Sequence, residues 1–313
     1  MKKKVVILGG GNGLSTLLRG IKNFPVDITA IVTVSDDGTS TGRLREEFNI
    51  PAVGDIRRVL VSLSETEPLV EELFNYRFKT TSELNGHTVG NLLLTAITNI
   101  AGNMSDGIES LGKILNLKGK VLPLTEDNCT LMAEMSDGKI IEGEHNITET
   151  LGKIKKVFYK EKTVITPETM KAIKEADLIV LSMGSLYTSI LPNLIEKEMI
   201  NQIDASSAKI MYVCNIMTQP GETDGYKVSD HINTINEYLG KRKIDTVIVN
   251  DGKITPEIIE KYAVLEQKDP VILDKENIDK NIKIIECDLI DTSSGKISHD
   301  VLKLGFNIFS ETL

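Results

Sequence analysis

The chain has 313 residues, a hydrophobic fraction of 41% and a formal net charge of −9. The acidic balance disfavours general nucleic-acid binding, and 4% aromatic residues without tryptophan disfavour a stacking platform for single strands. Cys129, Cys214 and Cys287 are far apart and form no CxxC pair, which predicts buried free thiols in a reducing compartment. No apolar stretch has the length of a membrane span and the N-terminal apolar run ends in glycines, so a cytoplasmic protein without a signal peptide is expected.

The predicted elements begin with a strand, a glycine turn and a helix. Apolar residues 5–8 predict a buried strand, and Leu14, Leu17, Leu18 and Ile21 share one helix face. Glycines let a backbone approach an anion, and the helix start then points its free N–H groups at it. A turn of this kind can also be purely structural. The predicted ligand residues here are Gly10, Gly11, Asn12, Gly13, Leu14 and Ser15.

Apolar strands and helices alternate along the rest of the chain. Further strands are predicted at residues 27–34, 121–124, 129–135, 176–183, 208–214, 246–249, 270–273 and 282–286. Helices are predicted at residues 54–60, 68–76, 92–100, 106–115, 167–175, 231–239 and 301–308, with the 92–100 helix largely buried. Residues 184–189 are predicted as a turn into a further helix that ends near residue 199. This rhythm predicts an α/β fold, a doubly wound and mostly parallel sheet with helices on both faces.

One departure from the rhythm is expected. Asp137-Gly138 signals a tight turn between residues 129–135 and a return strand at 140–141, which predicts a small hairpin. We therefore predict a single domain over 1–313 with a small excursion around 125–166. The loops after Gly9, Ser35, Gly184 and Asn215 all follow strands and should meet at one rim, where such sheets bind ligands.

Two carboxylates and four arginines lie after the strand predicted at residues 27–34. Of Asp36 and Asp37, at most one is expected to face a ligand, where it could bind Mg²⁺, hold a ribose hydroxyl or act as a base. Their position is that of the acidic residue that binds the ribose in an NAD site. However, Leu14 stands at the position of the third glycine of the G-x-G-x-x-G motif. Asp55 is placed to cap the helix predicted at 54–60 or to stabilise its positive N-terminus. Planar phosphate donors are offered by Arg43, Arg45, Arg57 and Arg58, the alternative being surface salt bridges.

Further polar residues could complete the site. His87 could donate to a phosphoryl oxygen or carry a proton, or be a histidine satisfied at a helix start. Asn91 could bind a base or sugar edge, or a neighbouring loop. His145, His231 and His299 are interpreted as structural or exposed, and Gly184-Ser185-Leu186 lacks the G-x-S-x-G frame of a nucleophile elbow. The polar loop 215–222 suits a base or sugar.

Five sequence blocks together resemble a known family: GGGNGLS, SDDGTSTGRLR, GDIRRVL, GHTVGNLLL and CNIMTQPGET. They are similar to the gluconeogenesis factor proteins of bacteria, which belong with the phospholactate transferases (CofD) of deazaflavin cofactor synthesis. The resemblance implies a Rossmann-like sheet and a nucleotide ligand, UDP-N-acetylglucosamine, at its carboxyl-end rim. It also implies a role in cell shape and cell-wall synthesis during gluconeogenic growth. Asn12 stands where the family usually has Thr, and Thr39-Ser40-Thr41 where it usually has Gly-Ser-Ser.

Three functions stay open at this point: a UDP-sugar-binding regulator without turnover, a Mg²⁺-dependent transferase of the phospholactate type, and an NAD-binding protein. The expected partners are a small nucleotide ligand, a second copy of the chain and cell-wall synthesis proteins, with no nucleic acid. Catalytic candidates are Asp36, Asp37 and His87. Besides the glycine turn, the predicted ligand-binding residues are Asp36, Asp37, Ser40, Arg43, Arg45, Asp55, Arg57, Arg58, His87, Asn91, Asn215, Thr218, Gln219, Gly221, Glu222 and Thr223.

Overall fold

A parallel seven-stranded sheet runs through the molecule in a computed structural model that describes residues 2–293 and 297–313. Its five inner strands are apolar and buried along most of their length, as expected where helices cover both faces, whereas the edge strand β10 is only partly buried. In sheet order they are β10 (Lys283–Cys287), β9 (Thr246–Asn250), β8 (Lys209–Val213), β7 (Leu178–Leu181), β1 (Lys4–Gly9), β2 (Asp27–Val32) and β3 (Lys120–Pro123). The predicted doubly wound, mostly parallel α/β fold is confirmed.

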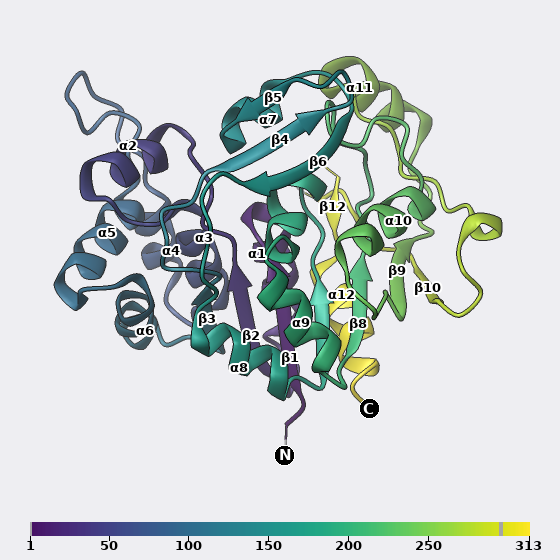
Figure 1. The fold of residues 1–313 in the computed structure, drawn as a ribbon, viewed down its shortest axis with the longest axis horizontal. Coiled ribbons are helices and arrows are strands. Elements are labelled where there is room, and N and C mark those ends of the chain that lie inside the picture. The colour runs from purple at the N-terminus through teal and green to yellow at the C-terminus, as the bar shows by residue number, and fades with distance from the viewer. Residues whose placement is uncertain (1, 294–296) are drawn as a thin grey trace.

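Helices cover the sheet on both sides. On one face α1 (Gly11–Ile21) packs against α3 (Gly54–Leu63) and the C-terminal α12 (Val301–Ser310). On the other lie α8 (Pro167–Glu175), α9 (Lys197–Ala205) and α10 (Val228–Tyr238), in front of the sheet in Figure 1. The connection from β2 to β3 carries the remaining helices of the N-terminal half to one side: α2 (Thr39–Phe48), α4 (Pro68–Asn75), α5 (Val89–Ala101) and α6 (Met104–Ile114).

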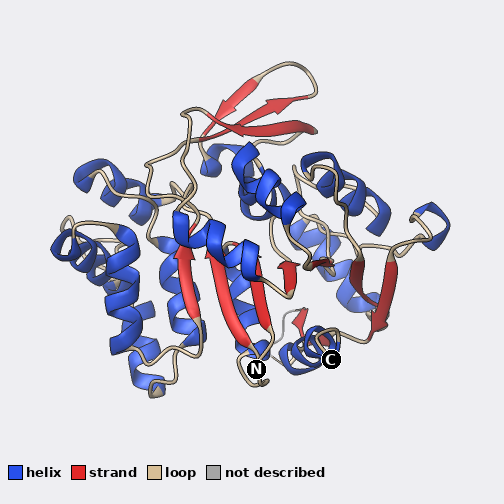
Figure 2. Cartoon of the chain, turned by 60° about the horizontal axis from the view of Figure 1, so that its bottom comes forward, coloured by secondary structure: helices blue, strands red, loops and turns tan. Residues whose placement is uncertain are grey.

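A second, antiparallel sheet stands apart from the first. It has three strands in the order β5 (Ile140–Glu142), β4 (Leu131–Met135) and β6 (Ile154–Tyr159), with the short helix α7 (Glu144–Glu149) between β5 and β6. Figures 1 and 2 show this sheet above the carboxyl ends of the main strands. The predicted hairpin is confirmed as β4 and β5, and β6 adds a strand that the Lys-rich sequence did not signal.

The C-terminal part differs from prediction in two places. Residues 270–273 form no strand: Pro270 lacks an N–H, and the segment contacts loop 215–228 instead, through a single bridge to Met217. The turn at 184–189 and the helix predicted to follow it as far as residue 199 are instead broken into η1 (Leu186–Ile190), η2 (Leu191–Leu194) and α9, because Pro192 cannot donate to a continuous helix. An unpredicted helix α11 (Pro256–Glu266), a turn η3 (Lys275–Asn277) and a hairpin β11 (Ile290–Asp291) with β12 (Ser298–His299) complete the chain.

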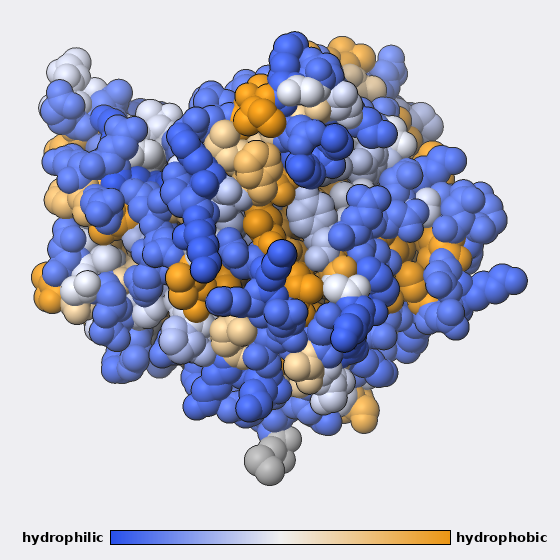
Figure 3. All heavy atoms as spheres, in the orientation of Figure 1, coloured by the Kyte–Doolittle hydropathy of each residue, from blue (hydrophilic) through white to orange (hydrophobic). Residues whose placement is uncertain are grey.

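Two burial predictions are also corrected. Helix α5 is only half-buried: Leu94 faces the core, while Leu93 and Ile100 are 42% and 85% exposed. Cys129 and Cys214 are buried free thiols as predicted, but Cys287 is half-buried. Figure 3 shows a largely hydrophilic face crossed by a narrow hydrophobic band near its middle. In the described part of the chain, helices are too short or too polar to cross a bilayer.

Candidate functional site

A cleft of about 600 Å³ lies beyond the carboxyl ends of β1, β2, β7 and β8. This is the edge at which doubly wound sheets bind ligands. Its walls come from the turn after β1, the loop after β2, the start of α3, the turn after β7, the loop after β8, α7 and the C-terminal hairpin. The polar side chains that line the cleft include Asn12, Asp36, Asp55, Arg58, Glu144, Ser185, Asn215, Thr218, Gln219, Lys268 and His299.

The glycine turn between β1 and α1 forms the floor of the cleft. Gly11 has φ +58°, which favours glycine, and a Cβ on Gly13 would lie 1.9 Å from the carbonyl oxygen of Met183, so position 13 requires glycine. Helix α1 has no side-chain cap and no acidic residue in its first turn. Within the described residues, the N–H groups of Asn12 and Gly13 have no hydrogen-bond acceptor, so they can receive an anion.

Asp55 is the buried acid of the cleft, with 5% exposure. Its Oδ2 accepts the N–H of Gly11 at 2.7 Å, and its Oδ1 accepts Nη1 of Arg58 at 2.7 Å. Of the two predicted roles, the cap is wrong, because Val53 is the N-cap of α3. Asp55 lies in the first turn of α3, as the other predicted role requires, and its side chain reaches across to the glycine turn. Burial, reinforced by the nearby charge of Asp36, raises the pKa of Asp55 to about 6, although Arg58 opposes the shift.

Two more carboxylates face the same space. Asp36 accepts the N–H of Gly38 at 2.8 Å and the hydroxyl of Thr41 at 3.1 Å. Burial, followed by the charges of Asp36 and Asp55, raises the pKa of the half-buried Glu144 well above its usual range. The described residues contain no group of three or more His, Cys, Asp or Glu side chains arranged to hold a metal ion. A Mg²⁺ ion at Asp36 would therefore need ligand phosphates to complete its coordination, as Mg²⁺ commonly does.

Asp37 does not line the cleft but brings Glu144 to it. Its Oδ1 accepts the N–H of His145 at 2.8 Å, so the loop after β2 is tied to α7. This explains why the two neighbouring aspartates have different surroundings: one faces the cleft and the other holds the smaller sheet against the first.

The arginines predicted for phosphate contacts divide in the same way. Arg58 lines the cleft. Arg43 donates to the carbonyl oxygens of Glu83 and Asn85, at 3.2 and 2.5 Å, and so holds loop 80–86. Arg45 is buried and donates to the carbonyl oxygens of Ser35, Asp36 and Cys129 and to Asn128. Arg57 is buried against Asn91 and Asn75.

The predicted polar cluster on α2 and α5 lies behind the cleft wall. Ser40 Oγ lies 3.1 Å from Nδ1 of His87 and accepts Nδ2 of Asn91 at 3.1 Å. Burial, and then the charge of Arg43, lower the pKa of His87. The other predicted ligand residues outside the cleft lining are Leu14, Ser15, Gly221, Glu222 and Thr223, of which all but Gly221 carry side chains packed beneath the surface.

Several lining residues were missed. Glu144 lies in a Lys- and Glu-rich stretch without pattern, and Lys268 follows a helix that the sequence did not signal. His299, interpreted as structural or exposed, is buried and lines the cleft, where its Nε2 donates to the carbonyl oxygen of Cys214 at 3.3 Å. Burial lowers the pKa of His299 to about 4, so it is neutral at physiological pH. A single histidine far from the other site residues carries no local signal.

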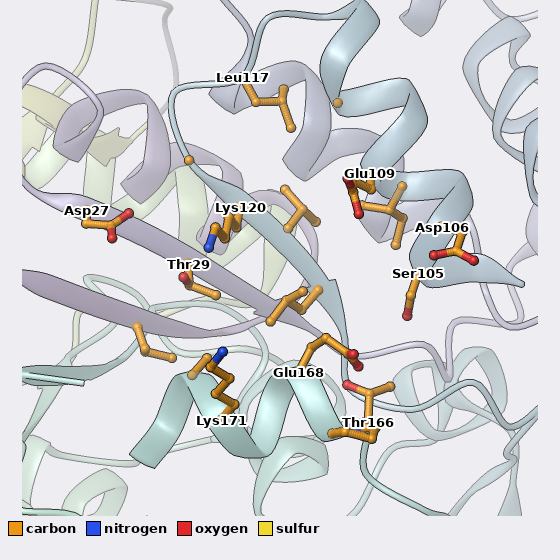
Figure 4. Close-up of a pocket in the computed structure, with 18 of the residues that line it drawn as sticks. Asp27, Thr29, Ser105, Asp106, Glu109, Leu117, Lys120, Thr166, Glu168 and Lys171 are labelled. Carbon is orange, nitrogen blue, oxygen red and sulfur yellow. The ribbon is translucent and has the colours of Figure 1, made fainter. Parts of the chain in front are cut away.

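A larger groove of about 1150 Å³ lies elsewhere, between α6 and α8 over β1, β2 and β3. Figure 4 shows Lys120, Lys171 and Thr29 among the residues that line it. Lys4 and Asp27, from the first residues of their strands, place it toward the amino ends of the sheet. Other charges there are already committed, with Lys4 paired to Glu175 and Lys113 to Glu109. We therefore regard the smaller cleft as the candidate site.

Comparison with known protein families identifies the family of the chain. The model described as 2-phospho-L-lactate transferase CofD matches residues 5–290. The chain belongs to the CofD family. Among CofD-family relatives, the gluconeogenesis factor of Bacillus subtilis is 47% identical over 305 residues, covering 97% of this chain and 96% of the relative. The gluconeogenesis factor of Halalkalibacterium halodurans is 50% identical over 278 residues, covering 88% and 86%.

Two solved structures share the fold closely. A crystal structure of a Bacillus halodurans protein has a TM-score of 0.95 and 46% identity, and covers 98% of this chain and 99% of that one. A second, described as a member of the UPF0052 family, has a TM-score of 0.94 and 45% identity, and covers 98% and 99%.

Proposed function

We propose that this protein is a cytoplasmic regulator that binds a nucleotide sugar, UDP-N-acetylglucosamine, in the cleft and supports cell-wall morphogenesis under gluconeogenic growth. The supporting observation is the uncapped start of α1, which opens into the cleft beside Arg58. Free N–H groups, the positive end of the helix dipole and a guanidinium together suit a diphosphate. The names of the relatives, gluconeogenesis factor, support the physiological part.

The rest of the cleft suits the remainder of such a ligand. Loop 215–219 supplies the amide of Gln219 for a base, and Asp36 is placed for a ribose hydroxyl or for Mg²⁺ bound together with the phosphates. Glu144 and Thr148, from α7, form the opposite wall, where a sugar would lie.

A transferase of the phospholactate type is the second candidate, favoured by the description of the matching family model. In that case the cleft carboxylates would have to bind a metal–nucleotide complex. A neighbouring carboxyl such as Glu144 would accept the proton that the attacking group of the acceptor molecule loses.

Thermal-shift and calorimetric titrations with UDP-N-acetylglucosamine, GDP and NAD, each with and without Mg²⁺, separate these functions. Ligand at a hundredfold its Kd stabilises the fold by about 2.7 kcal/mol. Stabilisation by UDP-N-acetylglucosamine without its consumption supports the regulator. Stabilisation by GDP with Mg²⁺ and none by UDP-sugars would refute it in favour of the transferase.

A further inference from the structure

Glu222 is a buried carboxylate without a cationic partner among the described residues, and it lies directly behind the cleft with 3% exposure. Its Oε1 accepts Nε2 of Gln219 and Oγ of Ser185, both at 2.7 Å. Its Oε2 accepts Oγ of Ser185 at 2.5 Å and the N–H of Tyr187 at 3.1 Å. Glu222 therefore joins the loop after β8 to the turn after β7, and both of these segments line the cleft.

This contact fixes the orientation of the Gln219 side chain. An ionised carboxylate only accepts hydrogen bonds, so it selects the Nε2 end of the amide. The backbone is fixed as well, since the N–H of Gln219 donates to Oγ1 of Thr223 at 2.8 Å and its carbonyl oxygen accepts the N–H of Thr223 at 2.9 Å. Gln219 lines the cleft, and its Oε1 has no donor within the described part of the chain.

The other polar side chains of this loop are committed elsewhere. Both ends of the Asn215 amide bind Gly184: Oδ1 accepts its N–H at 2.9 Å and Nδ2 donates to its carbonyl oxygen at 2.7 Å. Oγ1 of Thr218 accepts the N–H of Asp269 at 2.9 Å. The amide of Gln219 is thus the side-chain amide of loop 215–219 that remains available to a ligand. Its oxygen can accept a hydrogen bond from that ligand.

We propose that Glu222 is a specificity-determining positioning residue, which locks Gln219 with its amide oxygen toward the ligand and so selects a base that carries a ring N–H. The inference rests on the proposed function. Uracil has a donor at N3, whereas cytosine has an acceptor at N3 and a donor at its amino group. A freely rotating glutamine amide can turn over to match either pattern. A glutamine amide held by a carboxylate matches the uracil pattern and opposes the lone pair of cytosine N3.

The test is the ratio of the Kd values for CDP and UDP, measured by calorimetry on the full chain. We expect the wild type to prefer UDP by about tenfold or more, because cytosine N3 and the amide oxygen of Gln219 would face each other as two acceptors without a donor. Glu222→Gln replaces the acceptor by a group that can also donate, so Gln219 can turn over and the ratio should fall to within about threefold. Gln219→Met, which has similar length and no amide, should lose the preference too.

Asp224→Asn is the matched control: the same acid-to-amide change in the same loop, on an exposed side chain outside the cleft. It should retain the wild-type ratio. Melting curves show whether each variant is folded, and the Gln219→Met ratio decides the matter if Glu222→Gln does not fold.

The outcomes separate the inference from the proposed function. Equal wild-type affinity for UDP and CDP would overturn the inference and leave the nucleotide-binding proposal standing. An unchanged ratio in folded Glu222→Gln or Gln219→Met would also overturn it. If the wild type bound neither UDP nor UDP-N-acetylglucosamine, both proposals would fall together.

Discussion

Replacing Asp55 by Asn should make the free protein more stable at neutral pH. Burial raises the pKa of this carboxyl from 3.8 to about 6 in the folded state. The folded state therefore binds more protons than the unfolded chain between these values, and stability falls as pH rises through this window. At about 1.4 kcal/mol per pH unit, the ionised carboxylate costs the fold about 3 kcal/mol at pH 7.5.

The Asn side chain keeps an oxygen for the N–H of Gly11 and removes the buried charge. Arg58 loses its partner, but it remains solvated because its side chain is 36% exposed. We expect a gain of about 2–3 kcal/mol at pH 7.5 in urea unfolding. Because unfolding entropy is about 2 cal/mol/K per residue, this corresponds to about 3–5 °C in Tm for 313 residues.

At pH 5 the wild type has taken up most of its proton in the folded state, so the gain should fall to about half. Asp224→Asn, at an exposed position, should change stability by less than about 0.5 kcal/mol at either pH. A gain of equal size at pH 5 and pH 7.5, or a loss of stability at pH 7.5, would contradict the reasoning.

Three further predictions concern the cleft and its frame. Arg58→Met should weaken UDP-N-acetylglucosamine binding about tenfold, since a charged hydrogen bond is worth about 1.5–3 kcal/mol; Arg43→Met, outside the cleft, should not, and calorimetry that ranked them the other way would refute this. Gly13→Ala should lower stability by at least about 1–3 kcal/mol in urea unfolding, because the added methyl overlaps the Met183 carbonyl; a neutral effect would mean that the turn yields easily. Arg45→Met should cost about 3 kcal/mol, since it leaves the buried carbonyl oxygen of Cys129 without its donor; unchanged circular dichroism melts would contradict this.

The sheet and the rim could be predicted because their signals are local. The apolar runs at β1, β2, β7, β8 and β9 are too short and too β-branched for helices, and the glycine turn gives the position of the cleft floor. The right-handed crossover rule adds the hand of the connection between β1 and β2. Strand order and register come from the structure alone. The break at 184–194 was missed because Pro192 was not weighed against the apolar helix pattern around it.

The sequence did not predict which of the candidate site residues line the cleft and which ones bind other parts of the protein. Arg43, Arg45 and Arg57 have the same residue type and setting in the sequence as Arg58, yet backbone carbonyls and asparagines bind the first three. Which arginine is left for a ligand depends on carbonyl groups up to 84 residues away. Glu144 and His299 come from segments that are far from the glycine turn in the sequence, so no sequence motif contains them together with that turn.

The smaller sheet has an evolutionary consequence. Glu144 and Thr148, which form one wall of the cleft, lie on the short helix α7 outside the main sheet, and Asp37 fastens that helix through a backbone N–H rather than a side chain. Substitutions at these two positions therefore leave the seven central strands and the α1 turn undisturbed, provided that the buried Ile147 stays apolar. Related proteins with this fold can thus differ at this wall of the cleft without a change in the main sheet, and so bind different groups beyond the diphosphate.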